Sequence, residues 1–298
     1  QGWGLGYCDG QAIFVPNTLP GDTVRLTHTY RRKRTTFGTV DTLIQPSPLR
    51  NKSLCHHYPT CGGCQLIHVN YTDQLELKQA MLTDLIQQLD PQFAYTPEVI
   101  VPVQHTQFFR NKMDFSFATH ADKTVYLGLK ERGRFDRVHP VPDCQLASSH
   151  MATLLSRVSQ WATDHQLSTW DYHAHTGILR HLVVRESKTH GGFLLMLSVS
   201  EPIPTLLTEL AHTLSVGDLT QTLPIRGLVQ SVHAEASDHS LAMDTSLIAG
   251  SPIITETILN TTFKIAINAF FQTNTHQAEV LFQTLLDVAE FKPSDRVL

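Results

Sequence analysis

Three of the five cysteines in this 298-residue chain lie within ten residues, at Cys55, Cys61 and Cys64. Thiolates at this density either coordinate a metal centre or form disulfides. Two glycines between Cys61 and Cys64 allow the backbone to fold tightly, so that both sulfur atoms can face one centre. A fourth cysteine, Cys144, follows a Pro-Val-Pro-Asp segment that the prolines hold extended. Four thiolates suit either a tetrahedral zinc ion or a cubane iron–sulfur cluster.

The spacing of the four cysteines favours the cluster. Two paired C-x2-C motifs are typical of zinc, whereas three close cysteines with one remote cysteine favour [4Fe–4S], although spacing alone leaves zinc open. Disulfides or buried thiols are the third interpretation, and they are disfavoured in a chain without a secretion signal. The fifth cysteine, Cys8, lies in a glycine-rich, strand-like segment, where we expect a buried core thiol.

Length and composition indicate a soluble protein of two or three domains. The chain is 41% hydrophobic and 17% charged. It contains no run of eighteen apolar residues and does not begin with a basic-then-apolar pattern, so we expect neither a membrane protein nor a secreted one. A monomer in a reducing cytoplasm is the expectation.

The net charge of −4 is unevenly distributed along the sequence. Residues 1–50 hold six Lys/Arg against three Asp/Glu, and residues 105–140 hold seven against four. The remainder of the chain is strongly acidic, with ten basic and twenty acidic residues. Basic patches on an acidic body are typical of a nucleic-acid-binding protein with a separate catalytic part, although ordinary solvated faces explain counts this small as well.

The elements that must position these residues begin with a small β module over residues 1–49. An apolar strand at 12–15, a Pro-Gly-Asp turn at 20–22 and an alternating strand at 23–27 precede a hairpin. This hairpin carries four consecutive cations beside Tyr30. Cations next to an aromatic suit a phosphate backbone with base stacking, and a solvated hairpin tip is the alternative. The four cations are Arg31, Arg32, Lys33 and Arg34.

Beyond the cysteines, an amphipathic pattern predicts a helix over residues 71–89, capped by Thr72 or Asp73. Residues 99–267 are predicted to be β-rich with few long helices. Paired strands are predicted at 114–118 with 124–129, and at 181–185 with 193–199 around a Gly-Gly turn. Further helices are predicted at 148–165, 203–214 and 275–290, and a strand should begin at 295. Lys130 to Arg134 is predicted as a solvated turn.

Several motifs together resemble one family, the RNA (uracil-5-)-methyltransferases, in the branch with an N-terminal TRAM domain and a [4Fe–4S] cluster. The order of the β module resembles a TRAM domain, an RNA-binding small barrel. Members of this branch typically modify 23S ribosomal RNA, and the tRNA-modifying branch, taken to lack both features, fits less well. The motifs are Cys55-x5-Cys61-Gly62-Gly63-Cys64, Tyr71…Gln74…Lys78, Phe109-Arg110-Asn111-Lys112, Pro142-x-Cys144 and Phe270-Phe271-Gln272-x-Asn274.

The resemblance implies roles for these residues. Cys55, Cys61, Cys64 and Cys144 would ligate the cluster, and Gln272 would contact S-adenosylmethionine or the target uracil. Phe270 or its neighbour Phe271 would stack on a base, although on residues alone adjacent phenylalanines are often core. The segment with Arg110, Asn111 and Lys112 can grip a phosphate or a splayed base, and a fold-stabilising arginine is the alternative.

The implied fold is an α+β multidomain assembly. Residues 1–49 would form the TRAM-like barrel, residues 50–72 and 105–268 a β-rich central domain with the cluster, and residues 73–104 and 269–298 the start of a Rossmann-like methyltransferase domain. Uracil-C5 methylation in this family uses a cysteine that adds at C6. That cysteine and the cofactor motif would follow Leu298, so we expect no catalytic residue in this chain and no methylation by these 298 residues alone.

Two other functions are compatible with the residues. A stand-alone RNA-binding protein with a structural zinc ion held by four cysteines would use the same basic hairpin and the same four thiolates. An iron–sulfur electron carrier is the third hypothesis, and it leaves the long β region and the basic hairpin without a role.

Overall fold

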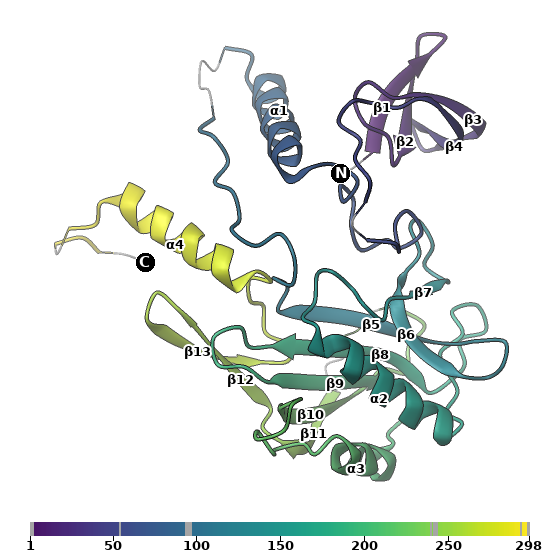
Figure 1. Ribbon diagram of the computed structural model, residues 1–298, viewed down its shortest axis with the longest axis vertical. Helices are drawn as coiled ribbons and strands as arrows, with labels where there is room; N and C mark the ends of the chain where they lie inside the picture. The colour runs from purple at the N-terminus through teal and green to yellow at the C-terminus, as the bar shows by residue number, and fades with distance from the viewer. Residues whose placement is uncertain are drawn as a thin grey trace. The chain divides into compact units, whose positions relative to one another are not determined.

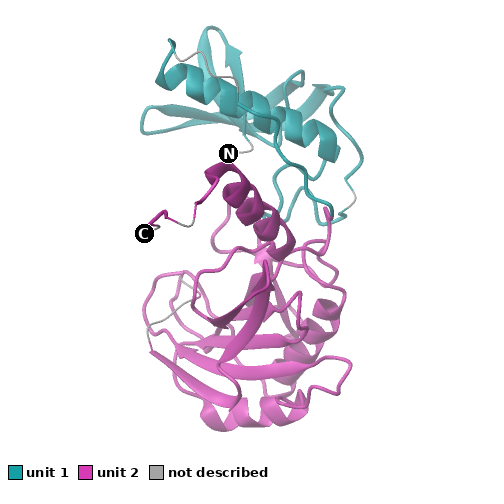
Figure 2. Cartoon of the chain, turned by 90° about the vertical axis from the view of Figure 1, so that its left-hand side faces the viewer, with its two compact units in different colours: residues 1–104 teal, residues 105–298 magenta. Residues whose placement is uncertain are grey.

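The computed structural model describes residues 3–53, 55–92, 97–238, 240, 244–292 and 294–296. It divides into two compact units, residues 1–104 and residues 105–298, which Figure 2 draws in different colours. Each unit has a sheet of its own (Figure 1). No helix among the described residues is long and apolar enough to cross a bilayer.

The first unit begins with a four-stranded sheet. Its strands are β1 (Trp3–Cys8), β2 (Gln11–Pro16), β3 (Thr23–Arg32) and β4 (Thr35–Gln45), in the order β1-β2-β4-β3. Strands β2 and β4 run parallel, and the other neighbours run antiparallel. Ile13, Val15 and Leu19 form the buried side of this module. The predicted β module is therefore confirmed as a sheet, but Cys8 is exposed, so its prediction as a core thiol is wrong.

A buried ion pair connects this module to the segment that follows it. The Asp22 carboxylate accepts hydrogen bonds from Arg50 Nε at 2.7 Å and from the backbone N–H groups of Leu19 and Ser47 at 2.7 and 2.8 Å. Burial alone would raise the pKa of Asp22, but these donors outweigh it and hold that pKa below its ordinary value. The predicted Pro-Gly-Asp turn therefore reverses the chain direction and, through Asp22, also holds the segment with Ser47 and Arg50 in place.

Helix α1 (Tyr71–Leu89) has the predicted bounds. Its N-cap is Asn70, without a side-chain capping bond, so the prediction of Thr72 or Asp73 as the cap is wrong. Gln74 instead attaches the first turn to the preceding loop, by donating to the carbonyl oxygens of Leu66 and Val69 at 3.0 and 2.9 Å. The apolar stripe remains exposed, with Leu89 79% exposed.

The second unit is built on a seven-stranded sheet in the order β11-β10-β9-β8-β5-β6-β7. Neighbouring strands are antiparallel except β9 and β10, which run parallel because helix α3 (Pro204–Thr213) lies between them in the chain. Helix α2 (His150–Asp164) contacts β6 (Figure 1). The strands are β5 (Lys112–Thr119), β6 (Val125–Lys130), β7 (Val138–Pro140), β8 (Leu179–Glu186), β9 (Phe193–Val199), β10 (Ile225–Val232) and β11 (Asp244–Gly250).

A hairpin of β12 (Ile253–Ile258) and β13 (Thr261–Ala266) packs on this sheet. Its Ile254 and Ile265 join Met196 and Val229 of the sheet in one buried apolar cluster. Helix α4 (Thr275–Ala289) follows and leaves much of its apolar surface exposed. The predicted strand pairs and helices of this unit are confirmed within a few residues.

One predicted element differs from the structure. Asp295 and Arg296 do not form a strand, and Val297 and Leu298 lie outside the described residues. By contacts, residues 50–104 group with the N-terminal module. The predicted division of these residues between a central domain and a methyltransferase domain stays a prediction.

Candidate functional site

One face of the N-terminal sheet carries exposed aromatic rings. Tyr30 lies opposite Phe37 across the β3–β4 pair, and their rings stack with centroids 5.4 Å apart. Trp3 meets Phe37 edge-on at 5.1 Å. Trp3 is 40% exposed and Tyr30 47% exposed. Because cross-strand partners point to the same side of a sheet, these rings form one accessible surface.

The four predicted cations lie beside these rings. Arg31 and Arg32 end β3, while Lys33 and Arg34 form the turn into β4, and all four are exposed. Arg32 is two residues beyond Tyr30, so it lies on the same face as the stacked rings. We call Trp3, Tyr30, Phe37 and Arg32 the aromatic–basic face. Sequence reasoning found Tyr30 and the cations but missed Trp3 and Phe37, because only the strand register shows that they share a face.

In the second unit, two buried side chains hold the backbone around the Phe-Phe-Gln-x-Asn motif. The Arg185 guanidinium donates from Nε to the Ile267 carbonyl at 3.0 Å and from Nη2 to the Ala269 carbonyl. Asn111 donates from Nδ2 to the Gln272 carbonyl at 2.8 Å. Burial lowers the pKa of Arg185, against the influence of Asp114. These donors fix the path of the loop on both sides of Phe270.

A buried carboxylate continues this arrangement. Glu256 is 2% exposed, and it accepts from the backbone N–H groups of Lys188 and Thr189 at 2.9 Å each. It also accepts from the Thr275 hydroxyl at 3.0 Å, and that hydroxyl accepts from Asn111 Nδ2 at 2.9 Å. Strand β12, the β8–β9 turn, β5 and the start of α4 are thereby joined through one continuous set of hydrogen bonds.

This fixed loop presents two predicted residues outward. Phe270 is 87% exposed, and the Gln272 side chain is exposed as well. Phe271 points the other way, where it packs on the apolar cluster and meets Phe263 at 5.8 Å. The two adjacent phenylalanines therefore have opposite surroundings, as alternation along an extended segment predicts.

The structure separates the three predicted RNA contacts that precede β5. Asn111 is 4% exposed and bonded to the loop, so its prediction as a direct RNA contact is wrong. Arg110 is half-buried, and its Nε donates to the Lys112 carbonyl at 3.0 Å. Lys112 lies 3.6 Å from the Asp114 carboxylate. Arg110 and Lys112 stay predictions as RNA contacts.

Lys130 differs from its prediction as part of a solvated turn. Its ammonium lies 3.2 Å from the ring centre of Tyr172 and 3.6 Å from the Asp238 carboxylate. Burial lowers the pKa of Lys130 to about 8, although Asp238 opposes the shift. Nearby, the fully buried Arg180 donates to the carbonyl oxygens of His233 and Glu235 at 3.0 and 2.7 Å.

The cysteine segment forms a tight loop in the first unit. Cys55, Cys61 and Cys64 are each half-buried. The backbone N–H of Cys61 donates to the His57 carbonyl at 2.9 Å, and the N–H of Gly63 donates to Cys61 Sγ at 3.4 Å. A backbone donor to sulfur fits a thiolate that holds a cluster. Cys144, also half-buried, belongs to the second unit.

The N-terminal module matches a known domain family. Residues 1–49 match a family described as the TRAM domain of tRNA (uracil(54)-C(5))-methyltransferase. The predicted TRAM domain is thereby confirmed. The argument that a TRAM domain disfavours the tRNA-modifying enzymes is wrong, because this match is to a tRNA enzyme.

Nearly the whole chain is similar to several known proteins. The chain is 27% identical over 290 residues to an uncharacterized RNA methyltransferase of Caldanaerobacter subterraneus, covering 97% of this chain and 64% of the relative. It is 28% identical to the tRNA (uracil(54)-C(5))-methyltransferase of Pyrococcus furiosus, covering 100% and 65%. The crystal structure of Pyrococcus abyssi tRNA (uracil-54, C5)-methyltransferase with S-adenosyl-L-homocysteine matches with a TM-score of 0.71 at 25% identity, covering 92% and 60%.

The chain is thus similar, along nearly all of its length, to RNA methyltransferases that include tRNA (uracil(54)-C(5))-methyltransferases. It spans less than two thirds of the length of these relatives.

Proposed function

We propose that this chain is the RNA-recognition part of a methyltransferase that forms 5-methyluridine in a structured RNA, with S-adenosylmethionine as the methyl donor. The observation that carries the proposal is the aromatic–basic face, where Tyr30 stacks on Phe37 beside Arg32, within the segment that matches a TRAM domain. Aromatic rings stack on unpaired bases, and neighbouring cations bind phosphates. The similarity to RNA methyltransferases along the chain supports the reaction.

Phe270 and Gln272 are the proposed contacts to the reacting nucleotide or to the cofactor. Both are exposed on a loop whose backbone Arg185 and Asn111 hold. A target base must leave its stack to react, and an exposed aromatic ring can receive it. The Gln272 amide can both donate and accept, which suits the polar edge of a uracil.

The reaction requires groups that we place outside these residues. In the proposed mechanism, a cysteine thiolate adds to C6 of the uracil, and C5 then accepts a methyl group from the sulfonium of S-adenosylmethionine. A base removes the C5 proton, and the thiolate is eliminated. The exposed apolar side of α4, with Leu285 57% and Val288 77% exposed, supports a packing partner for this helix. We assign residues 73–104 and 269–298 to a methyltransferase domain.

We further propose that Cys55, Cys61, Cys64 and Cys144 hold a [4Fe–4S] cluster. The proposal rests on their spacing and on the N–H donated to Cys61 Sγ. Methyl transfer from a sulfonium needs no electron, so we propose that the cluster stabilises the fold. Anaerobic purification with an absorption spectrum and metal analysis tests this. About four irons per chain would support the cluster, whereas one zinc and no colour would establish the four-cysteine zinc alternative.

The RNA itself has two candidates. The cysteine spacing supports 23S ribosomal RNA, whereas the matched TRAM domain supports tRNA. Fluorescence anisotropy with a 23S fragment set and with unmodified tRNA distinguishes them. We expect one class to bind more tightly than a scrambled RNA of equal length. Equal binding of all three RNAs would reduce the proposal to non-specific RNA binding, and no binding would overturn it.

A further inference from the structure

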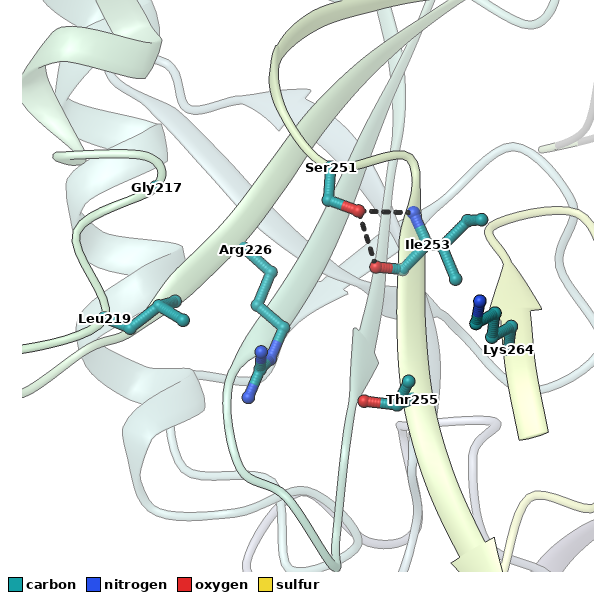
Figure 3. Close-up of a pocket in the computed structure, with 7 residues that line it drawn as sticks. All are labelled: Gly217, Leu219, Arg226, Ser251, Ile253, Thr255 and Lys264. Atoms are coloured by element: carbon teal, nitrogen blue, oxygen red, sulfur yellow. Dashed lines mark hydrogen bonds between the residues drawn. The ribbon is translucent and has the colours of Figure 1, made fainter. Parts of the chain in front are cut away.

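A pocket of about 390 Å³ lies in the second unit, apart from the Phe270–Asn274 loop that was described above. It is formed by the start of β10, by the β12–β13 hairpin and by the loop after α3. Figure 3 shows the Arg226 side chain between Leu219 and the strand that carries Ile253 and Thr255. Its volume is within the range of small-ligand sites. The principal lining residues are Leu219, Arg226, Ser251, Ile253, Thr255 and Lys264.

Arg226 is held in place by the β8–β9 turn. Its Nε donates to the Gly191 carbonyl and its Nη2 to the His190 carbonyl, both at 2.9 Å. Gly192 makes this possible, because it has a φ of +87° and a Cβ there would come within 2.8 Å of Nε. These two bonds leave Nη1 available, so a guanidinium in a fixed orientation faces the pocket.

Lys264 supplies a second cation from β13. It pairs across the hairpin with Thr255, so both side chains lie on the same outer face. None of the ion pairs among the described residues involves Arg226 or Lys264. The nearby Asp218 carboxylate accepts from Thr220 and Gln221 of its own loop. Asp218 therefore remains a negative charge in the loop beside the pocket, but neither Arg226 nor Lys264 is in an ion pair within the part of the chain that the structure describes.

The remaining walls offer both apolar and hydroxyl surface. Leu219 is 48% exposed and Ile253 39% exposed, so both offer apolar surface to the pocket. The Ser251 hydroxyl accepts from the Ile253 N–H at 3.2 Å and donates to the Ile253 carbonyl at 3.0 Å. Close approach at this turn requires Gly227, where a Cβ would lie 1.9 Å from the Ser251 carbonyl oxygen.

We propose that this pocket binds a nucleotide. Arg226 and Lys264 bind its phosphate, because two neighbouring cations that form no ion pair suit a dianion or a diester. Leu219 and Ile253 contact its base or sugar, and the hydroxyl of Thr255 forms a hydrogen bond with a polar edge of the base. The nucleotide comes from an RNA strand, or it is a free mononucleotide. The first source rests on the proposed RNA-binding function, and the second does not.

The test compares Lys264→Glu with Arg157→Glu in the full chain. Arg157 is exposed on α2, so both variants change the net charge equally while only one lies at the pocket. Binding of a short, fluorescein-labelled single-stranded RNA is measured by anisotropy at several salt concentrations. We expect Lys264→Glu to weaken RNA binding about tenfold and to reduce the salt slope by about 0.7, with little change for Arg157→Glu.

Uridine 5′-monophosphate is the second probe. Its binding is monitored through the NMR chemical shifts of the backbone amides of residues 251–255. Saturable binding that Lys264→Glu abolishes, with RNA affinity unchanged, would retain the pocket and identify a free nucleotide as its ligand. Equal behaviour of Lys264→Glu and Arg157→Glu with both probes would overturn the proposal. Arg32→Glu distinguishes failure of the pocket proposal from failure of the proposed RNA-binding function. If Arg32→Glu weakens RNA binding, Lys264→Glu does not, and the mononucleotide does not bind, then the aromatic–basic face binds RNA and the pocket proposal is overturned.

Discussion

The two units use arginine side chains in opposite ways, exposed in one and buried in the other. In the N-terminal sheet, Arg31 and Arg32 are exposed at the end of β3. In the second unit, Arg180 is fully buried and Arg185 is 3% exposed, and each donates to backbone carbonyl oxygens. A buried guanidinium loses its hydration, so it persists only where the protein supplies acceptors in its place. An exposed one has donors left for an external phosphate.

The Asp22–Arg50 pair refines this comparison, because it lies in the first unit and is still largely buried. The side chains are 1% and 20% exposed. Arg50 follows the β sheet and closes it against the next segment, whereas Arg31 and Arg32 lie at a hairpin end. The position of a cation within its element, rather than the unit that contains it, therefore determines whether it serves the fold or a ligand.

The largest effect should follow from Arg180→Met. The variant removes the guanidinium that donates to the carbonyl oxygens of His233 and Glu235 and that lies 3.9 Å from the Trp170 ring centre. We expect a loss of about 3–5 kcal/mol in the free energy of unfolding, measured by urea denaturation. Arg157→Met on the exposed side of α2 is the control and should change stability by no more than about 0.5 kcal/mol. Equal losses in the two variants would remove the distinction between buried and exposed cations.

Asn111→Ala tests the neutral counterpart of these buried donors. Its amide donates to the Gln272 carbonyl and to the Thr275 hydroxyl; the carbonyl would lose this donor, and the hydroxyl would keep only its bond to Glu256. We expect a loss of about 1–3 kcal/mol in unfolding free energy. Hydrogen exchange should also accelerate at Ala278, whose N–H donates to the Asn274 carbonyl at the start of α4. Lys112→Ala is the neighbouring control, because its partially exposed pair with Asp114 should contribute less than about 1 kcal/mol.

The sequence placed β5, β6, β8 and β9 of the second unit, because their signals are local, whereas β7 and β10 to β13 were covered only by the prediction of a β-rich region. The run 193–199 is wholly apolar apart from Ser198, and the preceding Gly-Gly pair sets the turn, so both β8 and β9 could be placed. The bounds of α1 were equally clear from its periodicity. Asn111 and Lys130 could not be assigned, because their burial depends on partners more than 100 residues away in the chain, such as Gln272 and Asp238.

The candidate sites show the same limit. The four cations and Tyr30 are adjacent in sequence and were found together, whereas Trp3 and Phe37 join them only through strand pairing. The pocket around Arg226 was not predicted at all, since its cations come from strands almost 40 residues apart with no shared motif. Contiguous motifs can be read from one sequence, but a surface assembled by register requires the fold.

The double variant Arg32→Glu/Lys33→Glu tests the exposed side of the comparison. Both residues lie at the β3–β4 hairpin end, so the free energy of unfolding should change by no more than about 0.5 kcal/mol. RNA affinity should decrease at least about tenfold, and the salt slope should decrease by about 1.4, because two phosphate contacts are lost. Anisotropy titrations across a salt series measure both quantities. A stability loss comparable to that of Arg180→Met would show that these cations serve the fold.

The smallest effect concerns Lys130, a cation that is buried but still able to titrate. Its folded-state pKa of about 8 lies below the value of about 10.4 expected in the unfolded chain. Between these values the unfolded state binds more protons, so the free energy of unfolding should rise as the pH increases through this window. Tyr172 acts in the opposite direction near the top of this window, because burial raises its pKa above the value of about 10 expected in the unfolded chain. Wild type and a variant at Lys130 both contain Tyr172, so a comparison between them reduces its influence. Asp238 stays ionised, since its pKa is lowered: burial opposes the shift, and the hydrogen bond from His181 and the charge of Lys130 outweigh it.

Lys130→Met isolates this contribution, because it keeps the length of the side chain and removes the titrating group. From about pH 7.5 to about pH 9.5, wild type should gain of order 1 kcal/mol relative to the variant. Urea denaturation at the two pH values measures the difference. A pH-independent difference would mean that Lys130 keeps an ordinary pKa and is solvated like Arg32. In that case burial would distinguish the arginines of the two units, and Lys130 would belong with the exposed cations.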